Sequence, residues 1–247
     1  MNNQPDIRIY PDPASLEDAV AKHFLLASNQ AVQQRGKALI ALSGGTTPLG
    51  LFQLLGSEAY RATVPWQQIH FFWVDERSVP PQDDQSNYGQ FKQKVLEPLQ
   101  ITPQQVHAID GNLPPEEAAQ EYENLLHNWA EAKQDLPRFD WVLLGLGTDG
   151  HTASLFPGVI NPQEEQRMVI AVTAEYEDRP AGRVTLTPLI LNQARQIVFM
   201  VTGQRKANTV REVLQAQHDP LRLPAQRIQP LDGRLVWMLD EAAASQL

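Results

Sequence analysis

The sequence predicts an α/β fold: a doubly wound, mainly parallel, Rossmann-like sheet with helices on both faces, in a single domain over residues 1–247. Short apolar runs alternate along the chain with helical patterns, which is typical of βαβ units. No fixed-period repeat, low-complexity tract or long charged linker divides the chain. A length of 247 residues, 42% of them hydrophobic, suits one substantial core.

The predicted strands are short runs rich in β-branched and aromatic residues. Continuous apolar runs of this length are typical of strands that are buried on both faces of a sheet. They cover residues 38–42, 69–74, 141–144, 168–172, 197–201 and 235–239.

The predicted helices lie between these strands. They cover residues 16–34, 48–56, 87–96, 115–133 and 204–215, with a short helix from Glu241. Pro115 followed by Glu116 and Glu117 suits a helix start, because proline's missing donor is harmless there and acids favour the positive end of the helix dipole. In such sheets ligands bind at the loops that leave the carboxyl ends of the strands, so we expect the functional residues there.

Composition excludes several classes of function. The chain has no cysteine, which rules out disulfides, a thiolate nucleophile and a thiolate zinc site. Its net charge of −9 argues against non-specific nucleic-acid binding and against docking on an anionic membrane. The N-terminus lacks the pattern of a secretory signal and no stretch is long enough to span a membrane, so we expect a cytoplasmic protein.

The first strand runs into Ser43-Gly44-Gly45-Thr46-Thr47-Pro48. Two glycines allow a sharp turn that aims backbone N–H groups at one point, and the threonines add hydroxyls beside a helix start. This arrangement predicts phosphate binding by Gly44, Gly45 and Thr46. The alternative is a tight turn capped by threonine, since the segment matches neither the Walker pattern nor the dinucleotide fingerprint.

Two further strand ends carry cations. Asp75-Glu76-Arg77 follows the second strand, and Arg77 could fork onto a phosphate, although a solvated loop with a local ion pair is the alternative. Lys206 falls in the first turn of the helix over residues 204–215, where a cation is unfavourable unless it faces an anion. An exposed surface lysine is the alternative there.

The motif that follows the strand over residues 141–144 presents a carboxylate and an imidazole two residues apart. The strand over residues 141–144 enters a glycine-rich bend, and Asp149-Gly150-His151 follows. Histidine is the side chain best suited to accept a proton near neutral pH and return it later. The setting of His151 singles it out, whereas the other five histidines are interpreted as structural.

Together the motifs resemble the 6-phosphogluconolactonase branch of the glucosamine-6-phosphate isomerase/6-phosphogluconolactonase family. The resemblance spans nearly the whole chain, in order. It is carried by residues 43–48, 75–77 with 86–88, 147–157, 183–187 and 203–207, and by the ending from Trp237 to Ala242.

The resemblance implies hydrolysis of 6-phospho-D-glucono-1,5-lactone to 6-phosphogluconate, in the oxidative branch of the pentose phosphate pathway, with no metal or organic cofactor. The implied partner is the small phosphorylated lactone itself, bound by a monomer or a small homo-oligomer. His151 would be the general base, and Asp75 and Asp149 would shape the site. Arg77 and Lys206 would hold the phosphate together with the glycine loop.

Arg183 is a further candidate for substrate contact that the resemblance implies. Whether Asp149 orients His151 or contacts the sugar stays open at this point. A Ser-His-Asp triad with Ser43 or Ser154 as nucleophile is a competing mechanism, but the chain has no Gly-x-Ser-x-Gly elbow.

Two rival functions remain. Glucosamine-6-phosphate isomerases and deaminases of the same family resemble this chain, but they carry a glutamate five residues after the histidine, where this chain has Phe156. Arg77 likewise replaces the aromatic residue that follows their Asp-Glu pair. A non-catalytic sugar-phosphate sensor is the rival from another class, and this chain offers no basic segment for a nucleic-acid-binding module.

Overall fold

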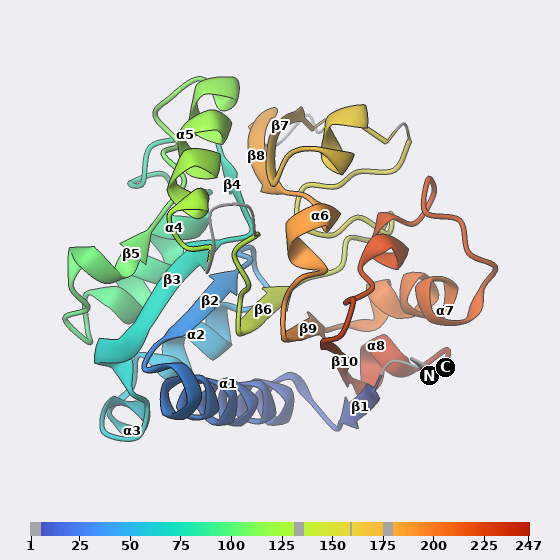
Figure 1. Ribbon diagram of the computed structural model, residues 1–247. Coiled ribbons are helices and arrows are strands. Elements are labelled where there is room, and N and C mark those ends of the chain that lie inside the picture. The colour runs from blue at the N-terminus through green and yellow to red at the C-terminus, as the bar shows by residue number, and fades with distance from the viewer. Residues whose placement is uncertain (1–5, 131–135, 159, 175–179) are drawn as a thin grey trace.

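The computed structural model describes residues 6–130, 136–158, 160–174 and 180–247 (Figure 1). Its main feature is a parallel sheet of seven strands in the order β1-β10-β9-β6-β2-β3-β5. Its strands are β1 (Asp6–Tyr10), β2 (Ala38–Leu42), β3 (Ile69–Trp73), β5 (Val106–His107), β6 (Trp141–Leu144), β9 (Gln196–Val201) and β10 (Arg234–Asp240). The predicted doubly wound α/β fold is confirmed.

The helices largely match the predicted ranges. They are α1 (Pro13–Arg35), α2 (Leu49–Leu55), α3 (Glu58–Arg61), α4 (Asn87–Phe91), α5 (Pro115–His127), α6 (Pro188–Leu191), α7 (Ala207–Gln215) and α8 (Glu241–Ala244). The predicted helix 87–96 continues past α4 as a π-helical segment, Lys92–Leu96. Helix α5 ends at His127, and the last residues of the range predicted for it, 131–133, lie outside the described residues.

A second, antiparallel sheet corrects the sequence prediction. It has the order β4-β8-β7 and consists of β4 (Asp75–Arg77), β8 (Gly182–Leu186) and β7 (Val169–Thr173). The run 168–172 was expected in the main sheet, but it pairs with β8 instead, because an apolar run does not specify its partner strand. Figure 1 shows this small sheet beyond the carboxyl end of β3.

Strand order places the topological switch point of the sheet between β2 and β6. The chain runs outward from β2 to β3 and β5, then returns to the other side of β2 and continues through β6, β9 and β10. The two halves therefore diverge between β2 and β6, which are hydrogen-bonded neighbours. In open α/β sheets, ligands commonly bind outside the carboxyl ends of the strands at such a switch point.

The core lies on the faces of the main sheet. Trp73, Trp141 and Trp237 are all buried, and Phe199 stacks on Trp237 with ring centroids 4.0 Å apart. Helix α1 packs against β2, β6 and β10. Among the described residues, none of the helices combines the length and the apolar character that crossing a membrane requires.

Candidate active site

Four neighbouring strands deliver the predicted motifs to one edge of the sheet. In the order β9, β6, β2, β3, these strands end at Val201, Leu144, Leu42 and Trp73. Lys206, His151, the glycine loop and Arg77 follow these four ends in turn. Because parallel strands are spaced about 4.8 Å apart, the four ends span roughly 14 Å, the scale of a sugar phosphate and the side chains that grip it.

The glycine loop after β2 packs tightly against α4. A Cβ atom on Gly44 would lie 2.1 Å from Asn87 Oδ1, so only glycine fits there. Gly45 has a φ of +92°, which favours glycine as well. Thr46 is exposed at the edge of the sheet. The loop therefore makes a tight turn that requires glycine at both positions, and phosphate binding there stays a prediction.

Asp75 is buried and links the loop after β6 with α4, which packs against the loop after β2. It is 5% exposed, and its Oδ2 accepts a hydrogen bond of 2.7 Å from Ser154 Oγ in the loop that carries His151. Asn87 Nδ2 donates to the Asp75 carbonyl oxygen at 2.8 Å. Through Asn87 and Ser154, Asp75 thus connects Gly44 with the β6 loop, which is the geometry of a residue that shapes the site.

Arg77 and Arg183 occupy opposite positions on two paired strands. β4 and β8 are antiparallel and their register pairs Arg77 with Arg183. Arg77 Nη1 donates to the Gln85 carbonyl oxygen at 2.5 Å, and the Arg183 guanidinium lies 6.0 Å from the ring centre of Phe156. The register therefore brings two arginines to neighbouring positions on the small sheet.

Asp149 and His151 form a pair at the carboxyl end of β6. His151 Nδ1 lies 2.5 Å from Asp149 Oδ1, which also accepts the His151 backbone N–H at 3.1 Å. A carboxylate beside Nδ1 favours the proton on that nitrogen, so the Nε2 lone pair is left to act as a base. Asp149 therefore contacts His151 directly, which favours an orienting role, and its role toward the sugar stays a prediction.

The loop around this pair is constrained. Gly147 N donates to the His151 carbonyl oxygen at 2.7 Å, and a Cβ on Gly147 would lie 2.1 Å from His151 Nδ1. Gly150 has a φ of +87° and Ala153 a φ of +52°, an unusual value for a residue with a side chain. The Phe156 ring lies 5.2 Å from the His151 ring, so Phe156 contacts both His151 and Arg183.

The serine alternatives lack the geometry of a nucleophile. Ser154 is fully buried and its hydroxyl donates to Asp75. Ser43 Oγ has no hydrogen-bond partner in the described part of the chain, so no base activates it. A triad needs the serine hydroxyl within hydrogen-bond reach of the histidine.

Lys206 lies at the end of β9, beside the His151 loop. A 3₁₀ turn over Gln204–Lys206 precedes α7, so the α-helix begins three residues later than predicted and Lys206 is its N-cap. Gly203, with a φ of +91°, makes the turn, and its N–H donates to Asp240. Thr209 Oγ1 donates to the Thr148 carbonyl oxygen at 2.8 Å, which ties α7 to the β6 loop.

Sequence reasoning did not assign Asn87 to the site, and it considered Ser154 only as an alternative nucleophile. Their contacts with Asp75 join residues 12 and 79 positions apart, and no local pattern specifies such pairs. The only available signal was their place in motifs that follow strand ends. Among the described residues, no group of three or more His, Asp or Glu side chains could hold a metal ion.

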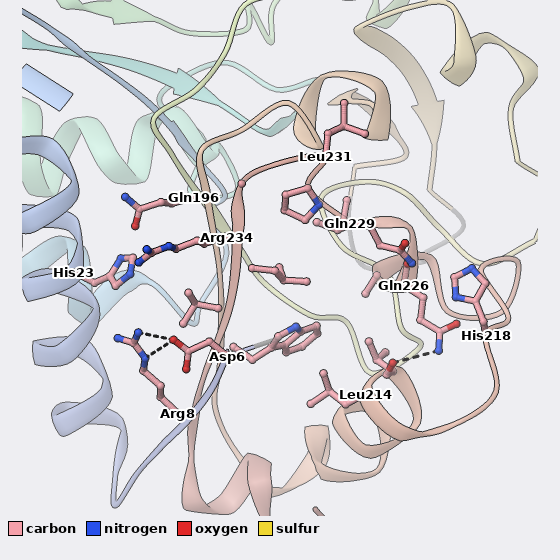
Figure 2. Close-up of a pocket in the computed structure, with 18 of the residues that line it drawn as sticks. Asp6, Arg8, His23, Gln196, Leu214, His218, Gln226, Gln229, Leu231 and Arg234 are labelled. Atoms are coloured by element: carbon pink, nitrogen blue, oxygen red, sulfur yellow. Dashed lines mark hydrogen bonds and ion pairs between the residues drawn. The ribbon is translucent and has the colours of Figure 1, made fainter. Parts of the chain in front are cut away.

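A cleft of about 810 Å³ lies at the opposite edge of the sheet (Figure 2). Asp6, Gln196 and Arg234, which line it, are the first residues of β1, β9 and β10. Figure 2 shows Arg8 paired with Asp6 there and Leu231 on the far side of the strands. The cleft is therefore separate from the predicted site, and none of the predicted site residues lines it.

Comparisons with known proteins identify the family of this chain. The model of the family described as glucosamine-6-phosphate isomerases/6-phosphogluconolactonase matches residues 11–237. The 6-phosphogluconolactonase of Haemophilus influenzae is 34% identical over 240 residues, covering 96% of this chain and 98% of that protein. The 6-phosphogluconolactonase of Synechocystis sp. is 37% identical over 220 residues, which is 88% of each chain.

Solved structures show the same likeness. The 6-phosphogluconolactonase from Trypanosoma brucei matches with a TM-score of 0.87 at 28% identity, covering 100% of both chains. A monomeric glucosamine-6-phosphate deaminase matches with a TM-score of 0.82 at 19% identity, covering 98% of this chain and 100% of that chain. The likeness to the deaminase is one of fold alone.

Proposed function

The chain belongs to the glucosamine-6-phosphate isomerase/6-phosphogluconolactonase family, and on that premise we propose that it hydrolyses 6-phospho-D-glucono-1,5-lactone to 6-phospho-D-gluconate. This reaction belongs to the oxidative branch of the pentose phosphate pathway. In this proposal, residues 1–247 form one catalytic domain, and the reaction takes place in the cytoplasm.

One observation carries the proposal: a histidine–carboxylate pair and two arginines gather at the switch point of the sheet. His151 is held by Asp149 after β6, while Arg77 and Arg183 face each other across β4 and β8. Phe156 lies against both His151 and Arg183, so the base and the cationic pair belong to one site. A base beside an anion grip suits a phosphorylated ester.

His151 supplies both proton transfers in the proposed reaction. Its Nε2 takes a proton from a water molecule whose oxygen attacks the C1 carbonyl carbon, and the carbonyl oxygen becomes an oxyanion. When the tetrahedral intermediate collapses, the bond between C1 and the ring oxygen breaks, and the imidazolium returns its proton to that oxygen. Such proton transfer typically contributes about 10²–10⁴-fold to the rate.

The carboxylates have different tasks in this mechanism. Asp149 orients the imidazole and stabilises the imidazolium that forms, because its Oδ1 lies 2.5 Å from Nδ1. Asp75 is a positioning residue, since its carboxylate binds Ser154 and Asn87. Backbone N–H groups of the glycine bends are the candidates for stabilising the oxyanion.

The phosphate is held at a distance from the reacting carbon. Arg77 and Arg183 supply two guanidinium groups, which can bind phosphate oxygens in pairs. Gly44, Gly45 and Thr46 supply backbone and hydroxyl donors, and Lys206 adds a charge from the β9 side. Anchoring the remote phosphate orients C1, and a misplacement of about 1 Å can cost about 10²-fold in rate.

The deaminase reading is less consistent with the site. The position five residues after the histidine, which holds a glutamate in that branch, is Phe156 here, and its ring packs against His151. A phenylalanine cannot take part in the proton relay that opens a sugar ring. The arginine at position 77 also distinguishes this chain from that branch.

The experiment is the decay of freshly generated 6-phosphogluconolactone, coupled to 6-phosphogluconate dehydrogenase, with wild type and with His151→Ala. We expect strong acceleration by wild type and a loss of about 10²–10⁴-fold in the folded variant. Circular dichroism and the unfolding midpoint check that the variant folds. No acceleration by wild type above the spontaneous decay would reject the lactonase and leave the isomerase and the sensor.

A further inference from the structure

Glu76 is a buried carboxylate that the proposed mechanism does not use. It is 2% exposed and lies between Asp75 and Arg77 on β4. Side chains alternate along a strand, so Glu76 points away from the face that carries its two neighbours. An acid buried in this way costs free energy unless donors satisfy it, which makes its partners informative.

Four donors converge on this carboxylate. Oε1 accepts the backbone N–H groups of Arg77 and Asn87, both at 2.8 Å. Oε2 accepts the Ser86 hydroxyl at 3.0 Å and the Tyr88 backbone N–H at 2.7 Å. The four donors lie at the two ends of one loop: Arg77 ends β4, and Ser86, Asn87 and Tyr88 are the N-cap and first residues of α4. Glu76 therefore closes this loop at both ends.

The closed loop carries two groups of the site. Arg77 is fixed at its backbone by Glu76 and at its guanidinium by the Gln85 carbonyl oxygen inside the loop. Asn87 is fixed at its backbone by Glu76, while its side chain binds Asp75 and packs against Gly44. One carboxylate thus sets the separation between the arginine and the glycine loop, the two sides of the phosphate grip.

We propose that Glu76 is a positioning residue that sets selectivity for the phosphorylated lactone by holding Arg77 and Asn87 at a fixed separation. This inference rests on the proposed function. It assigns to Glu76 no contact with the substrate and no proton transfer. His151 lies on another loop, so loss of Glu76 should weaken the phosphate grip more than the chemistry at C1.

The hydrogen-bond inventory explains why a carboxylate is needed. Three of the four donors are backbone N–H groups, which cannot reverse their role, and only a group with two acceptor oxygens satisfies them all. A glutamine would turn an N–H group toward one of these donors. Burial raises the pKa of Glu76 to about 7, with the three backbone N–H groups acting in the opposite direction. Keeping a charged carboxylate at this buried position therefore costs free energy.

The test compares two substrates in Glu76→Gln, which keeps the shape of the side chain. We expect kcat/KM for 6-phosphogluconolactone to fall roughly tenfold to a hundredfold, mainly through KM, as expected when a displaced loop loses about one hydrogen bond to the charged phosphate. For unphosphorylated glucono-1,5-lactone, kcat/KM should change by less than about threefold, since no phosphate is gripped. The ratio of the two values, the phosphate selectivity, is the readout.

Glu123 offers a matched control. It is also a buried carboxylate, 8% exposed, and it accepts the Met168 backbone N–H at 2.6 Å and Arg167 Nε at 2.8 Å. It lies on α5 against the start of β7 and contacts none of the site residues in these hydrogen bonds. Glu123→Gln should cost stability and leave the selectivity at the wild-type value, because a general loss of packing does not distinguish the substrates.

A double-variant cycle separates positioning from a structural effect. If Glu76 acts through Arg77, then Glu76→Gln adds little further loss of selectivity in an Arg77→Ala background. Equal losses with both substrates, or an undiminished loss in that background, would overturn the inference. If Glu76→Gln does not fold, Ser86→Ala removes one of the four donors and should reduce the selectivity in the same direction, whereas wild-type selectivity would overturn the inference.

A failure of the proposed function is recognised separately. It would appear as no acceleration by wild type with either lactone. In that case calorimetric binding of 6-phosphogluconate replaces turnover, and Glu76→Gln should weaken binding by the same tenfold to hundredfold. Unchanged affinity would overturn the role of Glu76 regardless of the reaction that the protein catalyses.

Discussion

At the scale of single residues, a substitution at Gly147 tests how strictly the position of the His151 imidazole is required. A Cβ on Gly147 would lie 2.1 Å from His151 Nδ1, so Gly147→Ala must displace the imidazole. We expect kcat to fall about 10²-fold, the typical result of a misplacement of about 1 Å. Gly145→Ala is the matched control in the same loop, because nothing lies within 4 Å of its added Cβ. Equal kcat values in both variants would contradict this placement.

Asp149 allows a second test at this scale. Asp149→Asn keeps the side chain's size but replaces the charge beside Nδ1 with an amide, which can favour the wrong tautomer. We expect kcat to fall about 10²-fold while KM for the phosphorylated lactone stays within about threefold, since the phosphate grip is unchanged. Steady-state kinetics check this split. A change confined to KM would instead indicate that Asp149 contacts the sugar.

The sequence predicted some residues of the site because their signals are local. Asp149 and His151 lie two positions apart, and the glycine loop follows an evident strand, so chemistry and spacing alone identified them. The role of Asp75 as a connector depends on Ser154, 79 positions away, and on Asn87. Such pairings are set by the packing of the loops, which local patterns do not encode. The roles of these residues in catalysis stay predictions.

At the scale of elements, five strands of the main sheet, β2, β3, β6, β9 and β10, could be predicted because they are mostly apolar. The edge strands β1 and β5 and the strand β8 were not predicted, since β1 is largely exposed, β5 has only two residues and β8 is interrupted by Arg183 and Thr185. The run 168–172 was recognised as a strand but assigned to the wrong sheet. Periodicity identifies a strand, whereas the choice of partner depends on the rest of the fold.

Asp240 provides a prediction for an element boundary. It accepts the Gly203 N–H at 3.0 Å in the turn before Lys206, and it caps α8 by accepting Ala243 N–H at 2.7 Å. We expect Asp240→Ala to cost about 1–2 kcal/mol of unfolding free energy and to raise KM for the phosphorylated lactone. Urea unfolding and steady-state kinetics measure the two effects.

The control for Asp240 is the cap of another helix. Asp12 accepts Ser15 N–H at 2.7 Å at the start of α1, with no link to the β9 turn. Asp12→Ala should therefore cost a similar stability and leave KM unchanged. If both variants leave KM unchanged, the turn before Lys206 does not depend on Asp240.

At the scale of the whole molecule, the local charge at the proposed site is opposite in sign to the net charge of the chain. The chain carries a net charge of −9, yet Arg77, Arg183 and Lys206 gather at the carboxyl edge of the sheet. A local concentration of cations within an acidic protein favours small anions over nucleic acid or anionic membranes. Fold and charge together favour this edge as the proposed ligand site, while the cleft of about 810 Å³ lies at the other edge.

The dependence of stability on pH tests the molecule as a whole. His70 Nδ1 and His107 Nε2 lie 3.1 Å apart, and burial lowers the pKa of both, that of His107 to about 4. The unfolded chain then binds more protons than the native state below pH ~6.5, so the stability that this pair contributes is lost as pH falls toward about 4.

The buried Glu76 has the opposite effect. Burial raises the pKa of Glu76 to about 7, so the stability that its protonated form contributes is lost as pH rises from about 4.5 through 7.

The two effects oppose each other over the same range, and variants separate them. Urea unfolding between pH 4.5 and 7 should show stability rising less steeply with pH in His107→Phe, which keeps a ring beside Phe72, and more steeply in Glu76→Gln. We expect each slope to differ from wild type by roughly 1 kcal/mol over this range, after allowing for solvent screening of half-buried histidines. Changes in slope of the same sign in both variants would contradict the assignment, because removal of a group with a lowered pKa and removal of one with a raised pKa must act in opposite directions.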